Sequence, residues 1–436
     1  MDTNSYGTQF DFTYAPGTSQ EQIIGFEMAG AIWSSYLQDN VTVRIHVEST
    51  DQLPDENIVG AALPAKEKDI KYDKLREHMQ ADRISSDDYT AYEHLPHNYD
   101  KDKEFTVFVN GEELDKTKEF RLTNANAKAL DLLDDDRKKL DGYIVVNDLA
   151  GTSAVGWDYD ALRNDTISNN SMDFVSVAMH EIGHVLGFVS GIDDSGWLEV
   201  LAESRYEGKE IKEDDFKFAS SLDLFRYSNE GEYKKPDLSN GGNPFFSIDG
   251  GISRLGNFAN GEDYGGDGYQ ASHWQQDSNQ GIMNPIIQEG ERKNISPLDL
   301  TAMDVIGWNV NRTVVLDWGD LYAEAVASSE TANIMDRSKD VEKMIKKETK
   351  NQLDGRRSWS GRSFNYSWQI GMWQHTTIEV PDIQEEILPE VEETEVAPQI
   401  EDSNTFGEST PETVFYPDTT AELDDEDNDE EYEDDD

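Results

Sequence analysis

The spacing of apolar residues along the chain predicts a mixed α/β (α+β) fold. Residues 20–37 and 174–186 carry apolar side chains at helical spacing, so each segment is expected to form a helix with one buried face. Short segments of alternating or β-branched apolar residues are expected to be strands: residues 10–14, 41–47, 105–109 and 143–147. The order of these elements indicates a twisted N-terminal sheet that precedes the second helix.

The pattern changes outside these elements. Charge-dense residues 65–100 predict a helical insertion, and residues 189–272, rich in Gly, Asn and Asp, predict a loop-rich one. Ser296 and Pro297 mark the start of a later helix, and Gly307 marks its end. We therefore expect an N-terminal subdomain, a loop-rich C-terminal subdomain, a helical and Trp-rich extension and an acidic tail, at residues 1–188, 189–310, 311–380 and 381–436.

Strong negative charge limits the partners of this protein. The chain of 436 residues has 91 acidic and 37 basic residues, a net charge of −54. Nucleic acids and anionic membranes attract basic surfaces, so this charge argues against both as partners. No run of 18 apolar residues is present that could span a membrane. The absence of cysteine excludes disulfides and a thiol nucleophile, and the tail, with 24 acidic and no basic residues, is expected to be disordered.

The motif H-E-x-x-H at residues 180–184 lies within the second predicted helix. Residues four apart share a helix face, so His180 and His184 can bind one zinc ion. Glu181 is then placed to take a proton from a zinc-bound water. The alternative is a core helix with two hydrogen-bonded histidines, but that helix would bury a glutamate without a partner, which is costly.

This motif and a later segment resemble the metzincin zinc metalloproteases. Residues 180–187 match the pattern H-E-x-x-H-x-x-G, but Ser190 stands where that pattern has its third histidine. His273, followed ten residues later by Met283 in a predicted tight turn, resembles the third ligand and the Met-turn of leishmanolysin-like metzincins. In that group a long insertion separates the helix from the third histidine. The same blocks are similar to a family of uncharacterised bacterial secreted metalloproteases.

The resemblance covers about residues 9–310 and implies an extracellular zinc protease. The ligands that it implies are His180, His184 and His273. It also implies that Met283 forms an apolar floor under the metal, and that an edge strand near residues 143–147 borders the cleft and pairs with extended substrate. Two features depart from this expectation: leishmanolysin is stabilised by cysteine pairs, which are absent here, and no signal peptide is visible at the N-terminus.

Other metal ligands remain open. Glu199 and Glu203 follow the motif at the distance of the glutamate ligand in gluzincins, although the sequence pattern of that group is absent. The remaining candidates for the third ligand are Ser190, Asp193 and Asp194, and a site without a third protein ligand is the last alternative. Calcium is a second candidate ion, because residues 239–243 and 260–268 offer oxygen ligands in turn-forming sequence; plain turns are the alternative there.

These expectations describe a zinc-dependent endopeptidase that hydrolyses protein or peptide substrates through a zinc-bound water activated by Glu181. A non-enzymatic binding protein that keeps a structural zinc on the same scaffold is an alternative, and so is another zinc hydrolase. Glu181 argues for catalysis, because a structural zinc site does not need a general base.

We predict that removal of residues 381–436 leaves zinc content, melting temperature and turnover of small neutral peptides unchanged. A segment with 24 acidic and no basic residues can neither pack nor pair internally. The truncation should slow cleavage of a strongly basic protein at low salt but not at high salt, because salt screens charges beyond about 8–10 Å. A truncated protein that aggregates or melts several degrees lower would show that the tail is part of the fold.

Overall fold

The computed structural model describes residues 7–51, 58–96, 103–134, 139–149, 155–192, 194–212, 216–229, 233–261, 265–276 and 279–353. All of them belong to the first of two units, residues 1–379, and the second unit is residues 380–436. The predicted acidic tail and the Trp-rich part of the predicted extension therefore lie outside the described residues. Within the described part, no helix is both long enough and apolar enough to cross a bilayer.

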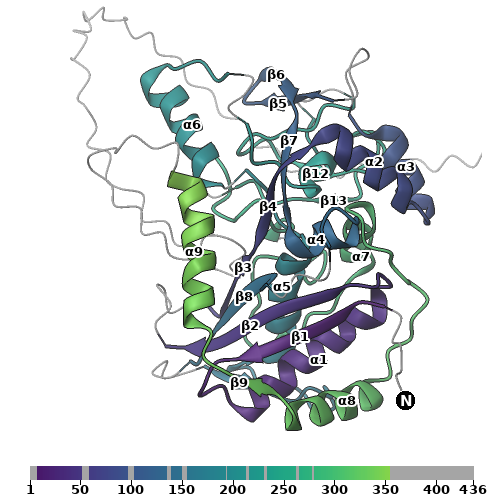
Figure 1. Cartoon of the computed structure of the whole chain (residues 1–436), viewed down its shortest axis with the longest axis vertical. Coiled ribbons are helices and arrows are strands. Elements are labelled where there is room, and N and C mark those ends of the chain that lie inside the picture. Colours follow the sequence, from purple (N-terminus) through teal and green to yellow (C-terminus); the bar gives the residue numbers. More distant parts are fainter. Residues whose placement is uncertain are drawn as a thin grey trace, which may run out of the picture. The chain divides into compact units, whose positions relative to one another are not determined.

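A five-stranded sheet lies at the centre of the described unit (Figure 1). Its strands, in spatial order, are β14 (Asn333–Ile334), β1 (Gln9–Tyr14), β2 (Thr42–Thr50), β8 (Gly142–Asn147) and β3 (Gly60–Pro64). The first four are parallel, and β3 pairs antiparallel with β8. The predicted mixed α/β class is confirmed, and so are the predicted strands that correspond to β1, β2 and β8.

The edge of the sheet differs from the expectation. The resemblance placed the edge strand near residues 143–147, and this is wrong, because β8 lies inside the sheet and β3 forms its edge. The β3 sequence, Gly-Ala-Ala-Leu-Pro, has no alternation of polar and apolar residues, so no local pattern marks it as a strand. At the opposite edge, β14 comes from the segment predicted as a C-terminal extension, which therefore contributes a strand to the N-terminal sheet.

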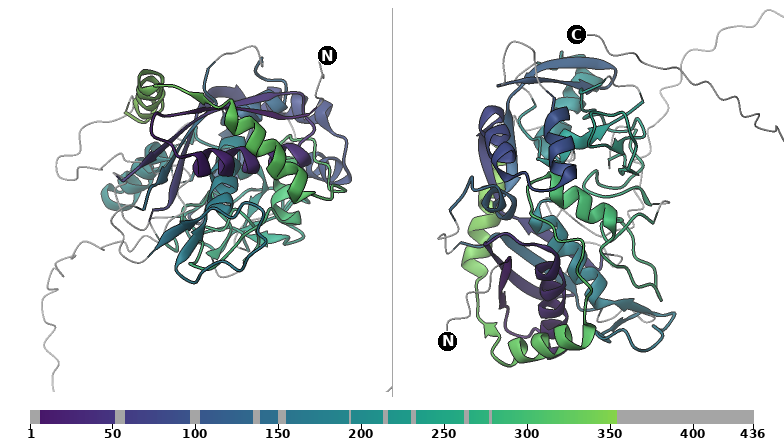
Figure 2. Two further views of the ribbon diagram at one scale, coloured as in Figure 1. Left: turned by 90° about the horizontal axis from the view of Figure 1, so that it is seen from below. Right: turned by 90° about the vertical axis from the view of Figure 1, so that its right-hand side faces the viewer.

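Helices cover both faces of this sheet. On one face, α1 (Gln20–Tyr36) and α5 (Phe174–Leu186) form the main core with side chains such as Ile144 and Val146 of β8. On the other face, α9 (Ser338–Leu353) covers a second apolar cluster that includes Leu63 and Tyr143. In the left view of Figure 2, α9 in light green and α1 in purple lie on opposite sides of the strands. α5, which carries the H-E-x-x-H motif, thus lies beside α1 on this face of the sheet.

The remaining elements surround this core. Before α5 they are β4 (Lys66–Lys71), α2 (Tyr72–Asp82), α3 (Ser86–His94), β5 (Phe105–Val109), β6 (Glu112–Thr117), β7 (Glu119–Thr123), α4 (Asn124–Ala129), β9 (Gly156–Asp158) and β10 (Ser171–Asp173). After α5 they are α6 (Ser195–Glu207), η1 (Leu222–Phe225), β11 (Arg226–Tyr227), β12 (Phe245–Phe246), β13 (Gly256–Asn257), α7 (Pro297–Val305) and α8 (Trp318–Glu330). The helices predicted within residues 65–100 and after Ser296 are confirmed, whereas α6 was not predicted.

Carboxylates from α2, α3 and α7 meet around one small cavity. Asp82, Asp88 and Asp304 line this cavity, whose volume is about 10 Å³. Burial and the charges of Asp39 and Asp88 together raise the pKa of Asp82 to about 7. Burial and the charge of Asp88 likewise raise the pKa of Asp304 to about 7. Ionisation of these groups therefore opposes folding.

We predict that Asp82→Asn raises the free energy of unfolding at pH 8, with a smaller gain at pH 5. The pKa of Asp82 is about 7 in the folded protein, above the roughly 3.9 of an unfolded chain, so stability rises as pH falls through 7 towards 4. Asparagine removes that dependence. Denaturant unfolding at pH values from 5 to 8 measures the free energy of unfolding. The control is Asp165→Asn, at an exposed position. Equal stability of Asp82→Asn and the unmodified protein at pH 8 would contradict this account.

Candidate metal centre

Three histidines from two distant parts of the chain meet at one point. His180 and His184 lie one turn apart on α5, and His273 comes from the segment between β13 and α7. Nε2 of His180 lies 3.0 Å from Nε2 of His184 and 3.3 Å from Nε2 of His273. All three side chains are buried, and among the described residues they form a group of potential ligands within reach of one ion. This group could bind a metal ion.

Hydrogen bonds fix the protonation of each ring. The Nδ1 atoms of His180, His184 and His273 face, in that order, the backbone carbonyls of Ile282 at 2.8 Å, Phe188 at 2.8 Å and Gln270 at 3.1 Å. A carbonyl oxygen only accepts, so each Nδ1 carries the proton and donates it. A neutral imidazole then presents a lone pair at Nε2. Three lone pairs therefore point at one another, and a cation between them relieves their repulsion.

The spacing of these nitrogens suits a tetrahedral ion. Nitrogens at 2.0–2.1 Å from a tetrahedral zinc ion lie about 3.3–3.4 Å apart. The two Nε2 separations, 3.0 and 3.3 Å, are close to that value. Burial lowers the pKa of His180 and His273 and lowers that of His184 to about 4, so all three rings are neutral at pH 7. Three neutral imidazoles favour a transition-metal ion over calcium, which prefers oxygen ligands.

Local sequence fixes both ends of α5. At its start, Asp173 accepts a hydrogen bond from the backbone N–H of Ser176 at 2.9 Å, and Arg163 pairs with the same carboxylate at 2.6 Å. At its end, Gly187 has a φ of 128°, which favours glycine. This turn directs the next carbonyl back to His184. The glycine of the motif thus ends the helix and positions the second ligand's hydrogen-bond partner.

Met283 packs against α5 between the two ligands. A Cβ atom at Gly183 would collide with the sulfur of Met283, so the close contact requires glycine there. Met283 lies in a tight turn at residues 281–284, and a carbonyl of this turn accepts the hydrogen bond from His180. The Met283 carbonyl itself accepts from the N–H of Trp274 at 2.9 Å. The turn therefore joins the first ligand to the segment that carries the third.

The carboxylate of Asp299 organises this turn. It accepts hydrogen bonds from the N–H of Ile282 at 2.8 Å, the indole of Trp274 at 2.7 Å and the N–H of Ser296 at 2.7 Å. The local sequence predicts the helix start at Ser296 but not these contacts of Asp299, because its partners in the turn and at Trp274 are 17 and 25 residues away. Asp299 is therefore a site residue that local pattern did not identify.

Glu181 is buried without a hydrogen-bond partner. Neither carboxyl oxygen has a partner among the described residues, and burial raises the pKa of Glu181 well above its usual range. Gly60 of β3 lies directly against it: a Cβ atom at Gly60 would come within 2.7 Å of the Glu181 Oε1 and 2.9 Å of Val177. The carboxyl group therefore stands between α5 and the edge strand, with its hydrogen-bonding capacity unused.

Ser190 makes hydrogen bonds to Asp223 and Ser272 and does not join the three histidines. Its hydroxyl donates to the carboxylate of Asp223 at 2.6 Å, and its N–H donates to the hydroxyl of Ser272 at 2.9 Å. Ser272 immediately precedes His273, so Ser190 ties the loop after α5 to the third ligand's segment. The residue that occupies the third-ligand position of the metzincin pattern thus supports the histidine that the structure brings to the site.

Asp194 and Glu203, the acidic candidates whose side chains the structure describes, do not join the histidines. Asp194 caps α6 and Glu203 pairs with Lys209 at 2.8 Å. Glu199 lies on α6, and Asp193 lies outside the described residues. Of the calcium candidates at 239–243 and 260–268, residues 262–264 are outside the described part. The residues of these two segments that the structure describes form no group of three ligands.

Comparison with known proteins identifies no protein similar to this chain. No protein-family model, curated protein or solved structure matches this chain. The resemblance to metzincins therefore stays a prediction that rests on the motif residues of the sequence.

We predict that His273→Ala removes most of the bound metal and that Ser190→Ala removes none. Loss of a ligand should weaken metal affinity by more than the ten- to about hundredfold that loss of an outer hydrogen-bond partner costs. Elemental analysis of the purified proteins measures this, and the unmodified protein should hold one ion per chain. Full metal content in folded His273→Ala would show that the ligand is assigned wrongly, and Glu199 and Glu203 would be tested next.

Proposed function

We propose that this protein is a zinc-dependent endopeptidase. The spacing of three neutral imidazoles supports zinc, which binds three histidines in catalytic sites and keeps a fourth position open. A bound zinc ion supplies Lewis-acid activation of a water molecule and of the peptide carbonyl. The observation that carries the proposal is Glu181, whose carboxyl group is buried and unpartnered beside the first ligand.

Glu181 supplies the proton transfers. Its carboxylate accepts a proton from the attacking water as the water oxygen bonds to the carbonyl carbon. It then returns that proton to the amide nitrogen as the C–N bond breaks. Burial favours the protonated form of Glu181, and the positive charge of an ion at the three imidazoles favours the carboxylate. These opposing influences suit a group that must both accept and release a proton near neutral pH.

The edge strand β3 supports a peptide substrate. Gly60 pairs with Val146, and the N–H of Asn147 donates to the carbonyl of Val59 at 3.0 Å. In an antiparallel ladder the next residues along the strand turn their backbone groups to the other side, so Gly60 and Ala62 direct theirs away from β8. An extended peptide can pair with this edge, and the Gly60 contact with Glu181 would place its backbone beside the general base.

A structural metal in a binding protein explains the histidines less completely. Structural zinc sites usually have four protein ligands, whereas three are brought together among the described residues. Such a site also leaves Glu181 without a role, although a buried carboxyl group without a partner costs free energy. Hydrolysis of other amides or esters uses the same chemistry, and the β3 edge is the feature that favours a polypeptide.

We predict that Glu181→Gln keeps the metal and the fold but lowers peptide hydrolysis by about two orders of magnitude or more, since a positioned general base contributes on that scale. Turnover on a peptide library, with and without chelator, measures the effect. Glu21→Gln, at an exposed position of α1, is the matched control and should retain activity. Turnover of Glu181→Gln within about threefold of the unmodified protein would rule out this mechanism. Fully metallated protein without any turnover would favour the binding-protein alternative.

A further inference from the structure

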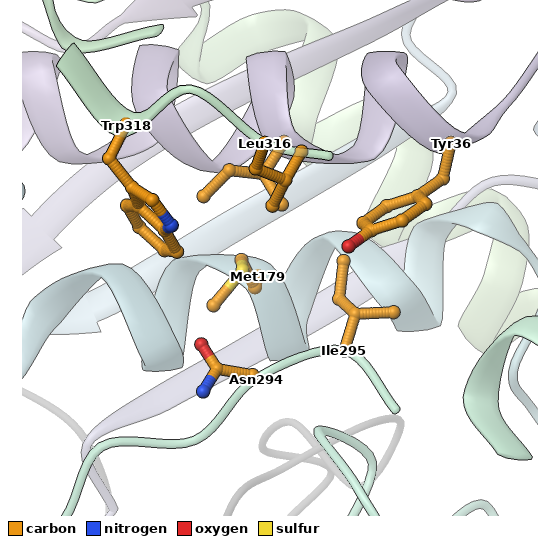
Figure 3. Close-up of a pocket in the computed structure, with 7 residues that line it drawn as sticks. Tyr36, Met179, Asn294, Ile295, Leu316 and Trp318 are labelled. Atoms are coloured by element: carbon orange, nitrogen blue, oxygen red, sulfur yellow. The ribbon is translucent and has the colours of Figure 1, made fainter. Parts of the chain in front are cut away.

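A second pocket lies against α5 on the side that faces α1 (Figure 3). Its volume is about 320 Å³, and it opens between α1, α5, the segment before α7 and the start of α8. Its lining includes Tyr36 of α1, Met179 of α5, Asn294 and Ile295 before α7, and Leu316 and Trp318 at the start of α8.

This pocket is separate from the metal centre. No metal ligand lines it. Met179 precedes His180, but successive residues of a helix point about 100° apart, so the two side chains leave α5 in different directions. The Met179 carbonyl also accepts a hydrogen bond from the indole of Trp33, at 2.9 Å, on the side of α5 that faces α1. A ligand in this pocket would therefore not occupy the position of the substrate beside Glu181.

The walls of the pocket are held in place by one partly buried cation outside it, Arg163. The guanidinium of Arg163 stacks on the ring of Trp318 at 5.1 Å and donates to the side-chain oxygen of Asn294. The same group pairs with Asp173 at the start of α5. Two walls that come from different segments are thus tied to the helix, which makes the pocket a built feature of the fold.

The lining combines apolar side chains with two polar atoms that make no hydrogen bond to another described residue. The hydroxyl of Tyr36 and the indole nitrogen of Trp318 point into the pocket from its opposite ends (Figure 3). Neither atom has a hydrogen bond to another described residue. No charged side chain is present among the described residues that line the pocket, so they offer no partner to an ionic ligand. Apolar walls with a few convergent polar atoms are typical of small-molecule sites.

We propose that this pocket binds a neutral aromatic molecule of about two rings that carries a hydroxyl or carbonyl group. A dry cavity of roughly 150 Å³ holds one benzene ring, and this pocket has about twice that volume. The ring system lies on Met179, Ile295 and Leu316. The polar group bonds to the Tyr36 hydroxyl or the Trp318 N–H, which otherwise lose their hydrogen bonds to water without replacement.

The test uses 2-naphthol as the probe and the full chain as the protein. Isothermal titration should show one saturable site with a dissociation constant below about 1 mM. Chelator should not change this affinity, because the pocket shares no residue with the metal centre. The charged analogue 2-naphthoate should bind at least about tenfold more weakly. Unsaturable heat with 2-naphthol, or binding that is lost with the metal, would overturn the proposal.

Variants at two neighbouring positions locate the site. Leu316→Trp fills the pocket and should weaken 2-naphthol binding at least about tenfold. Val315→Trp adds the same side chain at a position that is 92% exposed, and should change affinity by less than about twofold. Tyr36→Phe keeps the shape of the pocket and should weaken binding about three- to tenfold. Melting curves verify the fold of each variant. Unchanged affinity in both folded Leu316→Trp and Tyr36→Phe would place the probe elsewhere.

Discussion

The close approach of three neutral imidazole nitrogens is the constraint on which the candidate site depends. Their lone pairs repel at separations of 3.0 and 3.3 Å unless a cation lies between them. The protein holds each ring by one donation from Nδ1 to a backbone carbonyl. Those carbonyls belong to the end of α5, the turn that contains Met283 and the segment before His273. The ligand geometry is therefore set by the conformation of three backbone segments.

Two buried carboxylates fix these segments. Asp299 accepts hydrogen bonds from the Met283 turn and from the start of α7. Asp223 accepts from the hydroxyl of Ser190 and the N–H of Gly191, just after α5. Both carboxylates are satisfied by N–H and O–H groups, and burial raises the pKa of each. Neutral donors thus let a strongly acidic chain use buried acidic residues to position its loops.

Local sequence predicted the features that depend on local physics. Helical spacing of apolar residues identified α5, and the four-residue spacing of His180 and His184 placed both rings on one face. His273 could be singled out only through its resemblance to a known arrangement, because no local pattern distinguishes it from other histidines. β3 was missed because residues buried on both faces of a sheet show no alternation. The hydrogen bonds of Asp299 to Ile282 and Trp274 were not predicted for a similar reason, since hydrogen bonds between distant segments leave no periodic signal in the sequence.

The position of β14 in the sheet has a consequence for how the chain matures. β14 pairs with β1, and Thr13 lies opposite Asn333. That edge of the sheet is therefore complete only after residue 333 has been synthesised. During synthesis from the N-terminus, His273 emerges before β14, so the full ligand set is available while the outer side of β1 is still unpaired. An unpaired strand edge is prone to association with other chains. Early capture of a metal ion would then hold α5 and the Met283 turn together while the ribosome completes the last strand.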